Sequence, residues 1–212
     1  MNSKTLNNTN LLKEKTEMEV YKWDKLQQKR IKIKIEIIVN SENLILYSYK
    51  GSILKKYQTN PDIFYNIEQI TNLDWQGECG EKNLKSGKWR AIWKGKQLEE
   101  HSGYYENGMK KGIWNELFKN YFCHSQVYEQ GEYLDNKKVG KWKFLYLNDE
   151  IGGGSYDEGG NGIKVGKWID LDEEFYKDKQ LVYHGEYKNG NKVGLWSIWF
   201  NNGNIYKQMQ SI

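Results

Sequence analysis

The tripeptide Gly-x-Trp occurs five times in the C-terminal two-thirds of the chain, and this repetition constrains the fold more than any other feature. A Gly-x-Tyr element precedes each of the last four copies, and Cys79 takes the place of the Tyr in the first. A unit this short has no core of its own and is stable only when it packs on its neighbours, so we expect a stacked array. The five copies begin at Gly87, Gly112, Gly140, Gly166 and Gly194 and are nearly evenly spaced.

Turn residues lie between the two elements of a unit and indicate a hairpin. Asn107-Gly108, Asn161-Gly162 and Asn189-Gly190 are pairs that favour type I′ turns, because both residues tolerate positive φ. Each unit is therefore predicted to be a strand, a tight turn and a second strand. The fold class that follows is mainly β: an elongated antiparallel β-meander of stacked hairpins, with one short helix before the repeats.

A second, longer period overlies the first and spans two units, as from Gly112 to Gly166. The connectors at Tyr121–Val127 and Phe175–Leu181 are related by the same offset and share two adjacent aromatic residues and a Gln-aliphatic pair. The connectors after the first and third units are shorter. The building block is therefore either a single hairpin or a pair of hairpins joined by one longer loop.

The N-terminal third lacks the repeat, and we divide the chain accordingly. Residues 1–16 are expected to be a disordered tail, and residues 17–59 a degenerate meander that opens the same sheet as the repeats. Residues 60–75 are expected to hold a short helix and a linker, and residues 76–212 the five hairpin repeats with a terminal strand. Ile31–Ile37 alternates strictly between Ile and charged residues, which predicts a half-buried strand.

The predicted helix begins at Asn60-Pro61-Asp62 and runs to about Ile70. Asn is a favoured N-cap, Pro is favoured in the first turn, and an acidic residue suits the positive end of the helix dipole. Further strands are expected at Leu44–Tyr49, at Ser52–Tyr57 and, as an edge strand at the end of the repeats, at Ile205–Met209.

Two rows of large side chains follow from the repeat. Side chains alternate along a strand, so each repeat Trp and the residue three positions later are predicted to lie on opposite faces. The first row, with the repeat Tyr residues, is the predicted core: Tyr105, Tyr133, Tyr156, Tyr187, Trp89, Trp114, Trp142, Trp168 and Trp196. The second row is either covered by the chain's own loops or a candidate interaction face: Ile92, Leu117, Leu145, Leu171 and Trp199.

Composition excludes several classes of protein. The net charge is only +4, without the clustering of basic residues that a nucleic-acid partner requires. Mean hydropathy is −0.90, and the apolar runs are too short for a membrane-spanning helix, so none is expected. Two Cys residues are too few for a disulfide scaffold, and the first residues lack the apolar stretch of a signal peptide. We therefore expect a reduced, cytoplasmic protein.

No pattern of catalytic or metal-binding residues stands out. Cys123 and His124 are adjacent, which is not the spacing of structural zinc ligands, and neighbours on an extended chain point apart, which disfavours a nucleophile pair. Residues 160–167 imitate a phosphate loop imperfectly, and Gly152–Gly154 is best explained as a bulge or loop. We expect no catalytic, cofactor-binding or metal site, and no enzymatic activity. The three His residues lie in predicted connectors: His101, His124 and His184.

The segment Gly-Glu-Tyr-Lys-Asn-Gly-Asn-Lys-Val-Gly-Leu-Trp at residues 185–196 resembles MORN-type repeats, and particularly a variant class that is also seen in bacterial antitoxin-like proteins. The run Ile-Gly-Gly-Gly-Ser-Tyr-Asp-Glu at residues 151–158 is similar to the version expanded in ciliate proteins. The chain lacks the His-Gly-x-Gly segment of the standard MORN unit. The resemblance covers residues 77–200, and residues 17–57 loosely. It implies an elongated meander used in scaffolding, in cytoskeletal or ciliary assemblies, or in membrane apposition.

Three classes of function follow. The first is a non-catalytic protein-interaction scaffold that uses the repeat sheet as a platform for an unknown protein partner. The second is a peripheral membrane-binding module that uses the basic N-terminal region. The third is an antitoxin-like inhibitor, or an enzyme without a recognisable motif. The first is the expectation that the two apolar rows favour, in a cytoplasmic protein with a possible association with the cytoskeleton or a cilium.

Overall fold

The structure is a computed structural model that describes residues 12–41, 44–57, 66–200 and 205–210. The chain forms two compact parts, the N-terminal part (Met1–Thr71) and the repeat domain (Asn72–Ile212). Each has a β-sheet of its own, with four strands in the first and eleven in the second. The prediction that the N-terminal meander opens the repeat sheet is therefore wrong.

The N-terminal part is an antiparallel meander with a buried apolar side. β1 and β2 pair along nearly their whole length, with Met18 opposite Ile35. Val20, Ile35 and Tyr47 are buried. The strands are β1 (Leu12–Asp24), β2 (Lys29–Asn40), β3 (Ile45–Tyr49) and β4 (Ser52–Tyr57).

β1 begins within the segment that was predicted to be a disordered tail, so that prediction is wrong for residues 12–16 and concerns undescribed residues for 1–11. The physical reason is a set of ion pairs between the exposed side chains of β1 and β2. Lys15 lies 2.5 Å from Glu36, and Lys34 lies 3.4 Å from Glu17. Cross-strand pairs of opposite charge stabilise a sheet that looks too polar from one strand alone.

The predicted single short helix is confirmed, at α1 (Ile67–Asn72). Its cap is Asn66, whose side-chain oxygen accepts a hydrogen bond of 2.8 Å from the Gln69 N–H. The cap predicted at Asn60 lies outside the described residues. β5 follows α1 directly, so the predicted linker over residues 73–75 is strand instead. α1 lies in the sequence between β4, the last strand of the first sheet, and β5, the first strand of the second.

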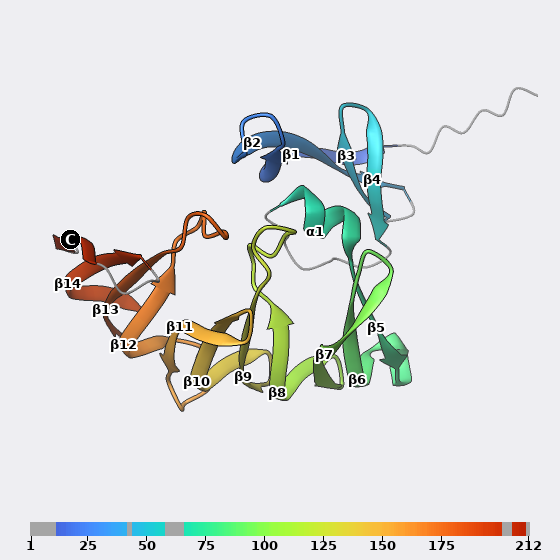
Figure 1. Cartoon of the computed structure of the whole chain (residues 1–212). Coiled ribbons are helices and arrows are strands. Elements are labelled where there is room, and N and C mark those ends of the chain that lie inside the picture. Colours follow the sequence, from blue (N-terminus) through green and yellow to red (C-terminus); the bar gives the residue numbers. More distant parts are fainter. Residues whose placement is uncertain (1–11, 42–43, 58–65, 201–204, 211–212) are drawn as a thin grey trace, which may run out of the picture. The chain divides into compact units, whose positions relative to one another are not determined.

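The repeat domain is an uninterrupted antiparallel meander, which confirms the predicted fold class. Its eleven strands are hydrogen-bonded in the order of the sequence, and Figure 1 shows them following one another along a curved sheet. A short 3₁₀ helix (Glu81–Asn83) follows the first strand. The strands are β5 (Leu73–Cys79), β6 (Lys85–Trp93), β7 (Lys96–Glu106), β8 (Met109–Leu117), β9 (Val127–Leu134), β10 (Lys137–Tyr146), β11 (Asp149–Tyr156), β12 (Lys164–Leu171), β13 (Leu181–Lys188), β14 (Asn191–Phe200) and β15 (Ile205–Gln210).

Two of the three predicted type I′ turns have the required backbone. Asn107-Gly108 and Asn189-Gly190 both combine two positive φ angles, near 50° and 80°. At Asn161-Gly162 only the Gly has positive φ, so the prediction is wrong there. The loop is longer because the Asp157 carboxylate accepts hydrogen bonds from the N–H groups of Asn161 and Ile163, at 3.3 and 2.7 Å.

The two glycines of each unit have different and complementary roles. The Gly of Gly-x-Tyr lies against the indole of the same unit's Trp: a Cβ on Gly131 would come within 2.2 Å of the Trp142 ring. The Gly of Gly-x-Trp is left-handed in all five units, with φ between 59° and 67°. In the first four units the indole N–H then reaches a main-chain carbonyl, as from Trp142 to Glu132 at 3.2 Å. Gly and Trp therefore recur together in each unit because the Trp ring packs on main chain that carries no side chain.

The two long connectors, which follow the second and fourth units, have the same conformation. In the first, the Phe118 N–H donates to the Val127 carbonyl, and in the second Asp172 donates to Leu181 in the corresponding bond. The connectors also touch, since the Lys177 N–H donates to the His124 carbonyl at 3.0 Å. This equivalence favours the pair of hairpins as the building block.

We predict that Gly131→Ala strongly destabilises the repeat domain, because the new methyl group overlaps the Trp142 ring. Overpacking of a core costs about 1–3 kcal/mol, and a contact this short belongs at or above the top of that range. The matched control is Gly80→Ala, whose Cβ would lie 3.4 Å from its nearest neighbour, Ser86. Urea denaturation should give a clear loss for the first and little change for the second. Equal midpoints would show that the ring does not need the glycine.

Candidate functional site

One face of the repeat sheet carries a Lys over every repeat Trp; we call it the Trp face. The ammonium group lies 4.0 to 4.7 Å from the indole centroid in all five units. Sequence reasoning missed these contacts, although a Lys stands at the fourth position before each repeat Trp. A cation over an indole face is attracted by the ring quadrupole, so these contacts stabilise the face. The five Lys residues are Lys85, Lys110, Lys138, Lys164 and Lys192.

Two carboxylates join these lysines in pairs. Glu116 lies 2.5 Å from Lys110 and 3.9 Å from Lys138, and it accepts a hydrogen bond of 2.5 Å from the Tyr133 hydroxyl. Burial opposes the ionisation of Glu116, but the two lysines and Tyr133 outweigh it and hold its pKa below the ordinary value. Glu129, close to Lys138, has a raised pKa because burial dominates there.

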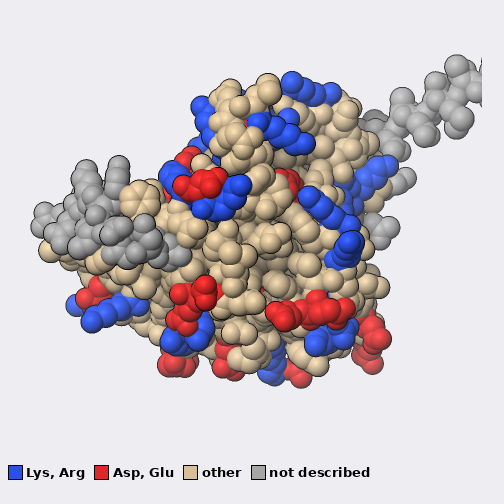
Figure 2. Space-filling view, viewed as in Figure 1, with Lys and Arg blue, Asp and Glu red and all other residues tan. Residues whose placement is uncertain are grey.

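Asp170 repeats this arrangement two units later. It lies 2.5 Å from Lys164 and 3.6 Å from Lys192, and it accepts a hydrogen bond of 2.7 Å from the Tyr187 hydroxyl. Burial lowers the pKa of Lys164. A cavity of about 500 Å³ between these groups is lined by four Lys and four acidic residues, so the charges of the Trp face are balanced locally. Basic and acidic side chains are likewise interspersed along the lower rim of the surface in Figure 2.

The residues predicted as repeat core lie where large rings are expected. All five repeat Trp side chains are at most 8% exposed. Tyr133 is buried, and Tyr105, Tyr156 and Tyr187 are half-buried against the same cluster.

The predicted interaction row is not one uniform surface. Leu117 and Leu171 are buried, whereas Ile92, Leu145 and Trp199 are half-buried. The two buried members end the strands that run into the two long connectors, and the other three lie in strands without such a connector. Burial of this row therefore follows the connectors, and Trp199 is the member of the row that lines a large apolar hollow.

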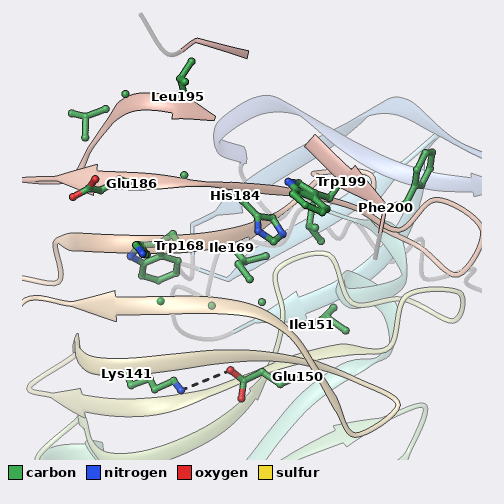
Figure 3. A pocket seen from close by; sticks show the side chains of 18 residues that line it. Lys141, Glu150, Ile151, Trp168, Ile169, His184, Glu186, Leu195, Trp199 and Phe200 are labelled. Carbon is green, nitrogen blue, oxygen red and sulfur yellow. Dashed lines mark ion pairs between the residues drawn. The ribbon is translucent and has the colours of Figure 1, made fainter. Parts of the chain in front are cut away.

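That hollow, which we call the glycine groove, has a volume of about 910 Å³ and lies across β10 to β14 (Figure 3). Its walls are mostly apolar, and charged residues are placed at its rim. Such a combination of an apolar interior with a few polar groups is typical of a binding site. The walls are formed by Ile151, Ile169, Val182, His184, Leu195, Trp199 and Phe200, and the rim carries Lys141, Glu150, Lys167 and Glu186.

The floor of the glycine groove is main chain without side chains. A Cβ on Gly152 would come within 2.6 Å of the Ile169 carbonyl oxygen, and one on Gly153 within 2.1 Å of the Trp142 carbonyl oxygen. Larger residues are therefore excluded from both positions. For this segment a bulge or loop was predicted, and the strand register shifts at Ile151, on the β10 side, and between Gly153 and Ser155, on the β12 side.

Aromatic rings form one wall. His184 stacks on Trp199 with 5.1 Å between ring centroids and 26° between planes, and the Trp199 indole N–H donates to the Ser197 hydroxyl at 2.7 Å. Burial lowers the pKa of His184, so the imidazole is neutral at neutral pH. The wall therefore presents two flat, uncharged rings to a ligand.

Cys123 and His124 are closer than predicted. The Cys123 sulfur lies 2.9 Å from His124 Nδ1, because Phe122 and Ser125 exchange main-chain hydrogen bonds in a tight turn instead of an extended chain. Among the described residues, no group of three or more His, Cys, Asp or Glu side chains could hold a metal ion. Within the same residues, no helix has the length and apolar character to cross a membrane.

No family model matches this chain, and no curated protein matches it in sequence.

We predict that His184→Phe makes the stability of the protein less sensitive to mild acid. The unfolded chain takes up a proton at the ordinary His pKa, about 6.5, and folded His184 only at a lower pH, so its contribution to stability falls as the pH drops. Phe keeps the ring contact with Trp199 but does not titrate. Chemical denaturation at neutral and mildly acidic pH measures the difference. His101, whose pKa is also lowered, is present in both proteins, so identical pH slopes would rule out a role for His184.

We also predict that removing residues 112–165 preserves a cooperative fold better than removing residues 112–139. The longer deletion places Lys110 at the fourth position before Trp168 and restores a carboxylate, Asp170, at the second position after it. The shorter deletion places Phe144 at the second position after the Trp that follows Lys110. Lys110, whose side chain is 16% exposed in the intact protein, then lies beside an apolar ring. Loss of one partner of a buried pair costs about 3–5 kcal/mol. Thermal melts followed by circular dichroism compare the two; a higher melting temperature for the shorter deletion would contradict the paired building block.

Proposed function

We propose that this protein is a non-catalytic protein-interaction scaffold whose repeat domain binds a partner in the glycine groove. The observation that carries the proposal is the groove itself, an open apolar hollow with one aromatic wall. Leu195 and Phe200 on its wall are 67% and 37% exposed. Exposed apolar side chains that converge on one hollow are typical of an interaction site.

The shape and charges of the groove define the partner we propose. A bare main-chain floor lets a flat or extended apolar segment approach closely, as the repeat Trp rings do on the glycines of the Gly-x-Tyr elements. The rim carries both signs of charge, and Lys141 is 3.9 Å from Glu150. We therefore propose a protein segment that is apolar or aromatic at its centre and carries no large net charge.

Other features favour a scaffold over a membrane-binding module. Lys15, Lys32 and Lys34 of the basic N-terminal region lie within 4.0 Å of carboxylates on the neighbouring strand. Such pairing weakens attraction to anionic lipid. The resemblance of the repeat to MORN-type units supports an assembly role, and we propose a cytoplasmic location, with association with the cytoskeleton or a cilium.

The test compares two exposed side chains at the same position of the repeat. Leu195 and Ile113 are the middle residues of their Gly-x-Trp elements and are 67% and 63% exposed, but only Leu195 lines the groove. The other three units have Lys at this position. We expect Leu195→Lys and Ile113→Lys each to change stability by about 0.5 kcal/mol or less, which thermal melts check.

The binding probe is a library of random peptides displayed on phage and selected on the full-length protein. Enriched peptides should have an apolar or aromatic centre, and their affinity, measured by fluorescence anisotropy, should fall at least several-fold for Leu195→Lys and remain unchanged for Ile113→Lys. Equal affinities for both variants would remove the groove from the proposal. If the protein co-sediments with anionic vesicles and both variants still do so, the membrane-binding alternative would be favoured.

A further inference from the structure

The turn between β1 and β2, which we call the Leu26 turn (residues 25–28), carries the most exposed large apolar side chain among the described residues. Leu26 is 96% exposed. The Asp24 carboxylate accepts hydrogen bonds from two main-chain N–H groups of the turn, at 2.8 and 3.0 Å, and the Gln28 side chain donates to the Lys25 carbonyl at 2.6 Å. The turn is therefore held by its own hydrogen bonds, and little conformational entropy is lost when a partner binds it.

The composition of this segment matches the ligand that we proposed for the glycine groove. A single exposed leucine is common on protein surfaces and identifies no site by itself. Residues 24–28, however, have an apolar centre, and one acidic residue, Asp24, balances one basic residue, Lys25. The other two residues are uncharged glutamines, so the segment carries no net charge. The chain thus contains a segment of the kind that its own groove is suited to bind.

Two charges at the rim of the groove have no ion-pair partner among the described residues. Lys167 on β12 and Glu186 on β13 are exposed cross-strand neighbours, but neither forms an ion pair there. The other two charged residues of the rim lie 3.9 Å from each other. Asp24 and Lys25, which are adjacent in sequence, have the signs that complement Lys167 and Glu186.

We propose that the occupant of the glycine groove is the Leu26 turn of a second copy of this protein. The inference rests on the proposed function, because it uses the same groove and names its partner. Leu26 packs against Leu195 and the two aromatic rings of the wall, and Lys25 approaches Glu186. The groove has a volume of about 910 Å³ and a floor of bare main chain, so it admits the main chain of a turn together with the leucine.

This contact joins two different surfaces, so it can repeat from one molecule to the next. When one turn is docked in one groove, the pair still has a free groove at one end and a free turn at the other. Contacts of this heterologous kind produce open chains unless the rotation between copies closes a ring. The protein is therefore expected to assemble head to tail as its concentration rises.

Sedimentation velocity of the full-length protein over a range of concentrations measures this assembly. The wild-type protein should sediment faster as the concentration rises, and Leu26→Ser should raise the Kd of association by about tenfold or more, because it removes the apolar centre of the turn. The matched control is Ile53→Ser, since Ile53 lies on β4 of the same N-terminal part and is 53% exposed. Thermal melts verify that both variants are folded. A monomeric wild-type protein, or equal association of the two variants, would overturn the proposal.

A mixing experiment tests which two surfaces meet. Leu26→Ser keeps an intact groove, and Leu195→Lys keeps an intact turn, so neither variant should assemble alone. An equimolar mixture should form dimers that do not grow further, because each pair joins the only intact turn to the only intact groove. A mixture that stays monomeric, or that forms complexes larger than a dimer, would contradict head-to-tail docking.

Failure of this proposal can be distinguished from failure of the proposed function. Peptides selected on the protein might be expected to compete with the turn, so they should bind Leu26→Ser with undiminished affinity and disperse the wild-type assembly. If they bind the groove but the wild-type protein is monomeric, the groove remains a binding site and the second copy is overturned as its occupant. Equal loss of assembly in Leu195→Lys and Ile113→Lys would remove the groove from both proposals.

Discussion

The contact between an indole ring and a glycine of the neighbouring strand is the interaction on which the repeat domain depends. In every unit the ring occupies the space that a Cβ would need, so the spacing between strands, the depth of the Trp and the identity of the Gly are fixed together. The left-handed Gly of each Gly-x-Trp element has φ between 59° and 67°. The five units accordingly share these glycines and rings, together with the Lys four positions before each repeat Trp.

The two faces of the repeat sheet differ in their chemistry. On the Trp face, lysines cover the rings, and the carboxylates Glu116 and Asp170 neutralise them in pairs, so that few charges face outward without a partner nearby. On the opposite face, apolar residues of the later units gather around Gly152–Gly154, whereas Ile113 of the second unit is exposed outside the groove. Buried ion pairs contribute little net stability but penalise wrong neighbours, which is one way for similar repeats to keep their order.

The meander and the turns at Asn107 and Asn189 could be predicted because each depends on local chemistry that repeats. The role of Glu116 could not be predicted. An acidic residue stands at the second position after the repeat Trp only in alternate units, and the partners of Glu116, Lys138 and Tyr133, come from strands further along the chain. The N-terminal end of β1 was missed for a similar reason, because its charged side chains are stabilised by opposite charges on the neighbouring strand, β2. The glycine groove was still harder to predict, because it forms only where three glycines of β11 lie among side chains from four other strands.

The order of the strands has a mechanical consequence. The repeat sheet begins at β5 and ends at β15, on opposite edges, and every strand between pairs only with its neighbours in sequence. A force that separates these two edges acts along the hydrogen bonds and loads them one pair at a time. We expect such a sheet to lengthen under tension by peeling off its end strands successively, at low force, while the middle units stay folded. A protein built this way can act as an extensible tether.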